Sequence, residues 1–314
     1  MVVTHVWIRL LAVAVIFVNG WTDAPNAIAT AVGSGALSFR RAVKLAAVCN
    51  FIGAAVSCLL FPAVAATVED LVRFHDQQAA LTALCAAMLA IVLWAGAAWR
   101  FGLPTSESHA LLAGLSGAAL ALGGNSAVLN GEAWIKVGIG LVLSLLLGAL
   151  AGRWMVHLLA RRRPNAVSWQ RISAGVMALL HGAQDSQKFL GLLLLADGLG
   201  GQESAHSLVL LLLVSSVMAL GTALGGRPIV EKVGRDLTVL SPAEGLAADL
   251  GAGAVLLLCS LLGLPVSTTH AKVAAVCGAG REPNPRILGE IGMTWALTFP
   301  CCAAIAFLLT KLML

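Results

Sequence analysis

Two carboxylates lie in the middle of strongly apolar stretches of this sequence. Asp23 lies within GWTDAPN and Asp185 within GAQDSQK. An unpaired carboxylate is costly in an apolar environment, so its presence there indicates a function. Carboxylate and amide oxygens suit a hard cation such as Na⁺, and the amides nearby are those of Asn26 and Gln187. Lys188 can pair with Asp185 on one helical face, whereas Asp23 has no basic residue within one turn.

Two short segments rich in serine and threonine form a second pair. They are PTSESH, which begins at Pro104, and PVSTTH, which begins at Pro265. Each proline ends one helix, and the hydroxyl side chains after it can cap the next. A helix N-terminus favours an anion, because it presents free N–H groups and the positive end of the helix dipole. The candidate anion ligands are Thr105, Ser106, Glu107, Ser108, Ser267, Thr268 and Thr269. The alternative is capping without a ligand, and the occurrence of two matching segments favours a site.

The charged and imidazole side chains around these segments refine the chemistry. Glu107 stands where the second segment has Thr268. A carboxylate repels a fully ionised anion but can accept the O–H that phosphate keeps at neutral pH and sulfate lacks, so Glu107 favours phosphate. Arg100, one turn before the first segment, either neutralises the site or anchors the helix at the membrane interface. His109 and His270 are the last residues of the two segments. We expect each histidine to fix its loop by hydrogen bonding, in preference to the alternative role of relaying a proton.

The composition requires a membrane environment. The chain has 314 residues, of which 59% are apolar and only 11% charged, and its mean hydropathy is +0.91. A soluble domain carries about 25% charged residues, so a soluble enzyme, a secreted scaffold and a disordered chain are excluded. Apolar runs of 20 or more residues are too long for transmembrane β-strands. We therefore predict an all-α polytopic membrane protein in contact with the lipid bilayer. No enzymatic activity, cofactor or nucleic-acid partner is expected, because no nucleophile lies beside a base and the basic residues lie in short loops.

Three landmarks recur along the chain with nearly the same offset. Asp185 follows Asp23 by 162 residues, while GLPVSTTHA follows GLPTSESHA, and Trp295 follows Trp134, by 161. This indicates an internal duplication with repeats 1–159 and 160–314. The first apolar run, residues 6–37, would measure about 48 Å as one helix, against a bilayer core of about 30 Å. The first crossing of each repeat is therefore predicted to be a broken helix.

The distribution of charge predicts the topology. Thirteen of the 20 lysines and arginines lie between apolar runs in segments that should face the cytoplasm: Arg40, Arg41, Lys44, Arg153, Arg161, Arg162, Arg163, Arg171, Arg227, Lys232, Arg235, Arg281 and Arg286. Other loops carry mainly acidic residues and should lie outside: Glu69, Asp70, Asp76, Glu132, Asp197 and Glu203.

These assignments of loops to the two sides of the membrane are consistent only if two segments each enter and leave the membrane on the same side. About 79–129 would then be a re-entrant helical hairpin from outside, and about 242–280 one from inside. Each repeat has three crossings plus one hairpin, so the second repeat is inverted and both termini lie outside. Inverted repeats with hairpins and broken helices are typical of secondary transporters.

With these motifs the sequence resembles the inorganic phosphate transporter (PiT) family. The family's duplicated Asp motif matches the segments around Asp23 and Asp185, and its P-x-S-T-T-H motif matches Pro265 to His270 fully. The likeness covers nearly the whole chain. Thr22 and Gln184 replace the asparagine that the family often has beside each aspartate.

The resemblance implies cation-coupled symport of inorganic phosphate across the cytoplasmic membrane by a homodimer. The coupling ion would be Na⁺, held by Asp23 and Asp185, or H⁺. A sulfate or related oxyanion permease of the same fold is the alternative, followed by an anion channel.

Overall fold

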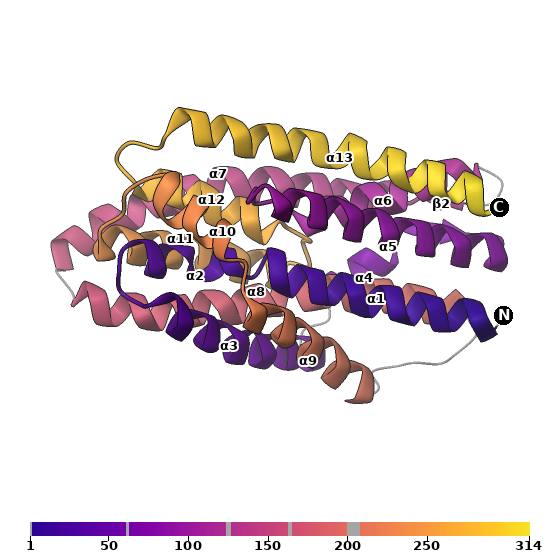
Figure 1. Ribbon diagram of the computed structural model, residues 1–314, viewed down its shortest axis with the longest axis horizontal. Helices are drawn as coiled ribbons and strands as arrows, with labels where there is room; N and C mark the ends of the chain where they lie inside the picture. The colour runs from indigo at the N-terminus through magenta and orange to yellow at the C-terminus, as the bar shows by residue number, and fades with distance from the viewer. Residues whose placement is uncertain (1, 61–62, 124–126, 163–164, 200–207) are drawn as a thin grey trace.

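The computed structural model describes residues 2–60, 63–123, 127–162, 165–199 and 208–314. Its helices run mostly along the long axis of the molecule (Figure 1). In the first half of the chain the elements are α1 (Val2–Thr22), α2 (Pro25–Gly33), α3 (Phe39–Leu60), α4 (Ala63–Glu69), β1 (Val72–Phe74), α5 (Gln77–Arg100), α6 (Glu107–Leu122), β2 (Ala127–Leu129) and α7 (Gly131–Arg162). In the second half they are α8 (Ala166–Leu199), α9 (Leu208–Leu224), α10 (Arg227–Glu231), the π-helix η1 (Lys232–Asp236), α11 (Pro242–Leu261), α12 (Thr268–Ala279) and α13 (Pro285–Met313).

The helices confirm the prediction of a polytopic all-α membrane protein. Within the described residues, six helices are long and apolar enough to cross a membrane, and α9 with the following helix adds a pair bent by 70°. A small ribbon was not predicted: β1 pairs antiparallel with β2, so that Val72 lies opposite Leu129.

The first apolar run is broken where the sequence suggested, between α1 and α2. The backbone N–H groups of Asp23 and Ala24 both donate to Asn19 O, at 2.8 and 3.2 Å, and Pro25 then has no N–H to continue the helix. The matching prediction for the second half is wrong, because α8 is one continuous helix from Ala166 to Leu199. Its QDSQK segment contains no proline, so every residue there can keep its helical hydrogen bond.

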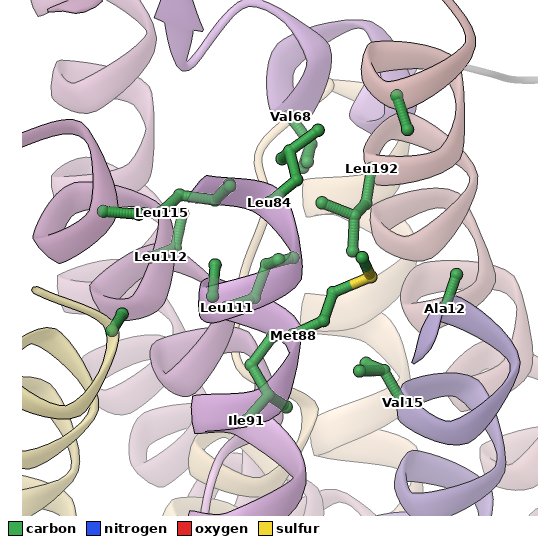
Figure 2. Packing of buried hydrophobic residues seen from close by; sticks show 14 of the residues in the cluster. Ala12, Val15, Val68, Leu84, Met88, Ile91, Leu111, Leu112, Leu115 and Leu192 are labelled. Atoms are coloured by element: carbon green, nitrogen blue, oxygen red, sulfur yellow. The ribbon is translucent and has the colours of Figure 1, made fainter. Parts of the chain in front are cut away.

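Two helical hairpins dominate the interior. In α5–α6 and in α11–α12 the connecting loop turns at a glycine with positive φ, 64° at Gly102 and 66° at Gly263. A side chain at either position would be strained. The core forms a large apolar cluster around each hairpin: Met88 and Leu111 belong to the first (Figure 2), and Val255 and Val273 to the second.

The two hairpins lie toward opposite ends of the molecule. Figure 1 places α5 and α6 toward the end where both chain termini lie, and α2, α11 and α12 toward the other. We call this other end the arginine-rich end, after Arg162, Arg171, Arg235, Arg281 and Arg286 in the segments that meet there. Contacts between those segments include Arg171 Nε to Ala36 O at 2.8 Å and Arg281 Nε to Glu244 Oε1 at 3.1 Å. The repeat boundaries, the inversion and the orientation in the membrane stay predictions.

Cysteine labelling tests the orientation. Arg162, Arg235 and Glu132 are exposed, whereas Glu203 lies outside the described residues. We expect a membrane-impermeant maleimide to label Arg162→Cys and Arg235→Cys only from the cytoplasmic side, and Glu132→Cys only from outside. The unmodified chain, whose free cysteines are buried or partly buried, gives the background. Labelling of Glu132→Cys and Arg235→Cys from the same side would contradict the inverted repeat.

Candidate functional site

The two hairpin tips end in capped helix N-termini. Ser106 caps α6 by accepting from the backbone N–H of His109 at 3.3 Å. Ser267 caps α12 in the same way, accepting from His270 N at 3.1 Å. In each contact the serine oxygen is the acceptor, so its own hydroxyl proton remains available to a ligand. Capping, the alternative reading of these serines, is therefore present and does not consume their donors.

The tips of the two hairpins touch. The imidazole rings of His109 and His270 lie 4.3 Å apart between centroids, and the ring of His270 also lies 3.8 Å from that of Trp295. Ser108 Oγ is 3.5 Å from Val266 O. The N-termini of α6 and α12 are thus brought together inside the protein, as a shared anion site requires.

Asp23 and Asp185 are joined through the second tip. Asp23 Oδ1 accepts from the hydroxyl of Thr269 and from Asn26 Nδ2 at 3.1 Å. Thr268 Oγ1 lies 3.5 Å from Asp23 Oδ2 and 3.3 Å from Asp185 Oδ2. Both aspartates are fully buried. The start of α12 therefore depends on both carboxylates for its position.

Lys188 connects Asp185 with the first tip. Its Nζ lies 2.5 Å from Asp185 Oδ1 and 2.6 Å from Ser108 Oγ, and the side chain is 1% exposed. Asp185 Oδ2 also accepts from Asn19 Nδ2 at 3.0 Å and lies 3.3 Å from His181 Nε2. A buried ammonium thus lies between a carboxylate and the N-terminus that was predicted to bind an anion.

Glu107 points into the same cluster. Its Oε1 accepts from the hydroxyl of Thr22, which is the residue next to Asp23. Glu107 Oε2 is buried and has no hydrogen-bond partner among the described residues. The cluster holds three acidic side chains against one lysine, so it favours the entry of positive charge.

Several atoms fit a small hard cation. Asp23, His181 and Asp185 each offer one ligand atom, and these atoms lie within 4.8 Å of one another. Two further amide oxygens, Asn19 Oδ1 and Asn26 Oδ1, are buried without a partner among the described residues. A set rich in carboxylate and amide oxygens suits Na⁺, and His181 is its one nitrogen.

Comparison with known proteins then decides the family. The profile of the phosphate transporter family matches residues 19–171 and 164–306. This chain belongs to the phosphate transporter family. It is 30% identical to a Bacillus subtilis protein and 34% identical to a Rhizobium meliloti protein, both named "Probable low-affinity inorganic phosphate transporter". These alignments cover 97% and 96% of this chain, and 96% and 94% of the respective relatives.

A solved structure shares the fold. It is described as "The sodium-dependent phosphate transporter", and it matches 99% of this chain and 98% of its own, with a TM-score of 0.87 at 21% identity. The match to the family profile and to these relatives confirms the resemblance inferred from the motifs. This member of the phosphate transporter family is a multi-pass membrane transporter rather than an enzyme.

Three predicted site residues of this family member lie outside the cluster. Thr105 Oγ1 accepts from Trp94 Nε1 at 3.0 Å and faces Thr298. Both ends of the Gln187 amide are used elsewhere: Oε1 accepts from Val64 N, and Nε2 donates to Ala183 O, each at 3.0 Å. Arg100 is exposed at the end of α5. The basic side chain at the site is therefore that of Lys188 and not that of Arg100.

Asn19 and His181 belong to the cluster and were missed. Each lies four residues before an aspartate of the pair, and the two are 162 residues apart. A polar side chain one helical turn from a buried carboxylate, repeated at the offset of the duplication, was the signal for both. Gln184 was considered only as a departure from the family motif. Its Nε2 donates to Leu264 O at 2.8 Å and so holds α8 against the second tip.

Proposed function

We propose that this protein carries inorganic phosphate across the cytoplasmic membrane together with a cation, Na⁺ or H⁺. The observation that carries the proposal is the meeting of two helix N-termini beside Lys188 and the paired aspartates. The names of the Bacillus and Rhizobium relatives support phosphate, and the description of the structural relative supports Na⁺.

Phosphate would bind between the hairpin tips. The hydroxyls of Ser106, Ser108 and Ser267, with the N-termini of α6 and α12, supply donors for its oxygens, and the Lys188 ammonium supplies positive charge. Glu107 Oε2, which is buried and unpartnered, would accept the O–H that phosphate keeps at neutral pH. Sulfate has no such proton to give.

The cation would bind at Asp23 and Asp185, with the free amide oxygens of Asn19 and Asn26 beside them. Coupling follows from charge. With three acidic side chains and one lysine, the cluster repels an incoming anion until a cation or a proton enters. Because Thr268 and Thr269 contact the aspartates directly, the same cation would fix the start of α12 for phosphate.

The architecture that goes with this function is also proposed. It comprises inverted repeats 1–159 and 160–314, hairpins entering from opposite sides, both termini outside, and a homodimer. The approach of α5–α6 and α11–α12 from opposite ends of the molecule supports this arrangement (Figure 1).

Uptake by proteoliposomes tests the proposal. With an imposed inward Na⁺ or H⁺ gradient, labelled phosphate should accumulate above its equilibrium level, and the rate should saturate with phosphate. Collapse of the gradient by an ionophore should abolish the accumulation, and a tenfold excess of sulfate should leave it nearly unchanged. Strong competition by sulfate would indicate the oxyanion permease, and a non-saturating flux that ignores both gradients would indicate a channel.

A further inference from the structure

A second buried ionic cluster lies beside the proposed site, outside the set of ligands. Asp249 of α11 pairs with Lys272 of α12, and both side chains are 0% exposed. Asp249 Oδ1 also accepts from Thr30 Oγ1 of α2 at 2.6 Å, and Oδ2 accepts from Ser173 Oγ of α8 at 2.7 Å. Lys272 Nζ donates in addition to Thr30 Oγ1 at 3.1 Å and to Ala27 O at 3.3 Å. Every polar atom of the ion pair therefore has a partner.

This cluster extends the contacts of the site by one helical turn. On α2, Thr30 follows Asn26 by four residues, and on α12, Lys272 follows Thr269 by three. Asn26 Nδ2 donates to Thr269 Oγ1 at 3.0 Å, and the contact between Thr30 and Lys272 is the next one toward the arginine-rich end. The ion pair belongs entirely to the hairpin α11–α12, whereas its hydroxyl partners belong to α2 and α8. The hairpin can therefore separate from α2 and α8 without separating the two charges.

The corresponding positions at the opposite end of the molecule are apolar. Subtracting 161 residues converts Asp249 and Lys272 into Met88 and Leu111 of the first hairpin. The offset of 162 converts Thr30 into Leu192 and Ser173 into Leu11. Met88, Leu111 and Leu192 are buried in one apolar cluster (Figure 2), and Leu11 packs against it. The second hairpin, α11–α12, is thus held against its neighbours by an ion pair and hydroxyl groups, which we call the polar seal. The first hairpin, α5–α6, is held by apolar side chains, which we call the apolar seal.

The two seals differ in how they respond to water. Opening an apolar seal exposes hydrocarbon to water, and its cost grows with the exposed area. Opening the polar seal exchanges hydrogen bonds within the protein for hydrogen bonds to water, and it returns hydration to two charges that burial had desolvated. Contact with water therefore opposes the separation of the first hairpin from its neighbours. At the second hairpin, contact with water compensates for the hydrogen bonds that separation breaks.

We propose that the Lys272–Asp249 cluster is a gate on the arginine-rich side of the site: the hairpin α11–α12 carries the ion pair away from Thr30 and Ser173 when the site opens to that side. The proposal rests on the transport function proposed above. Lys272 and Asp249 are positioning residues, because they act through the hairpin that carries Thr268 and Thr269.

The decisive variant replaces the ion pair of the second hairpin by the apolar residues that stand at the equivalent positions of the first hairpin. Asp249→Met with Lys272→Leu removes both charges together, so neither is left buried without a partner, and the freed Thr30 hydroxyl can bond to the carbonyl one turn before it. We expect exchange of labelled phosphate across proteoliposomes, at saturating phosphate, to fall at least about tenfold. The Kd for phosphate, measured in detergent, should change less than about threefold, and the unfolding temperature should not fall.

A second variant should act in the opposite direction. Thr30→Val keeps the volume and the ion pair but removes the hydroxyl that holds the closed gate. The loss of the two hydrogen bonds that this hydroxyl makes, one donated to Asp249 and one accepted from Lys272, should raise the saturating exchange rate between about two- and tenfold. Met88→Leu is the matched control at the other end, with about the same volume and an unchanged apolar seal.

Three results would overturn the gate. An unchanged saturating rate in the double variant would mean that the cluster does not control opening. A parallel loss of rate and phosphate affinity would mean that it only holds the binding site together. A change of the saturating exchange rate in the same direction in the double variant and in Thr30→Val would contradict the separation of the hairpin from α2. Failure of the proposed function would differ from all three, because the unmodified chain would then neither bind nor exchange phosphate.

Discussion

Asp23→Asn is expected to abolish gradient-driven accumulation of phosphate while the protein stays folded. The amide keeps an oxygen that can accept from Thr269 and Asn26, so the local hydrogen bonds survive. It loses the negative charge that offsets the coupling cation. A charged interaction of about 3 kcal/mol corresponds to a loss of at least about 100-fold in the initial rate of accumulation. The measurement is labelled phosphate uptake under Na⁺ and H⁺ gradients, normalised to folded protein.

Asp185→Asn should also abolish accumulation, but with a loss of stability that Asp23→Asn does not share. Asp185 is the ion-pair partner of Lys188, and breaking a buried pair by removing one partner costs about 3–5 kcal/mol. The double variant Asp185→Asn with Lys188→Gln removes both charges and should recover the unfolding temperature without recovering transport. This separates the structural role of the pair from its role in transport.

Asp70→Asn is the matched control for both aspartates, because Asp70 is an exposed residue outside the cluster. It should accumulate phosphate like the unmodified chain. Normal accumulation in both Asp23→Asn and Asp185→Asn would remove these residues from the coupling site. Loss of stability in Asp23→Asn comparable to that of Asp185→Asn would show that the two carboxylates are structurally equivalent.

The parts of the fold that could be predicted are those with a local cause. The first arms end before Pro104 and Pro265, at Arg100 and Leu261, where Gly102 and Gly263 turn the chain with a positive φ, and Ser106 and Ser267 cap the following helices through contacts three residues away. The resulting hairpins were therefore readable from short segments. A break in α8 was predicted by symmetry with the first apolar run. It does not occur, because Pro25, the local cause of the break between α1 and α2, has no counterpart in the second half.

The parts that could not be predicted depend on contacts between distant segments. Gln187 lies two residues from Asp185, yet its amide bonds to Val64 and Ala183 and not to a site residue. The ribbon of β1 and β2 forms because two loops lie side by side in space, and neither strand of three residues carries a pattern of its own. Lys188 was correctly paired with Asp185 from its spacing, but its contact with Ser108, 80 residues earlier, required the fold.

Glu107→Gln should reduce the preference for phosphate over sulfate. The amide oxygen can still accept from Thr22, so the change is confined to the other end of the side chain, where the buried and unpartnered Oε2 becomes an NH₂ group. That group donates where the carboxylate accepted, and it no longer repels a fully ionised oxyanion. The loss of one charged hydrogen bond, roughly 1.5–3 kcal/mol, corresponds to a fall of about 10- to 150-fold in the ratio of phosphate to sulfate transport.

The test is uptake of both anions between pH 6 and 8, with Glu107→Thr as the companion variant because threonine stands at the equivalent position, Thr268. Glu107→Thr should keep more phosphate transport than Glu107→Gln if hydroxyl geometry at the tip matters more than charge. An unchanged ratio in Glu107→Gln would show that Glu107 does not read the proton of the ligand. Glu107 would then be the candidate carrier of a coupled proton, because its carboxyl group is buried in the cluster. In that case the pH dependence of uptake should flatten while the selectivity stays constant, because an amide cannot take up or release the proton that drives transport.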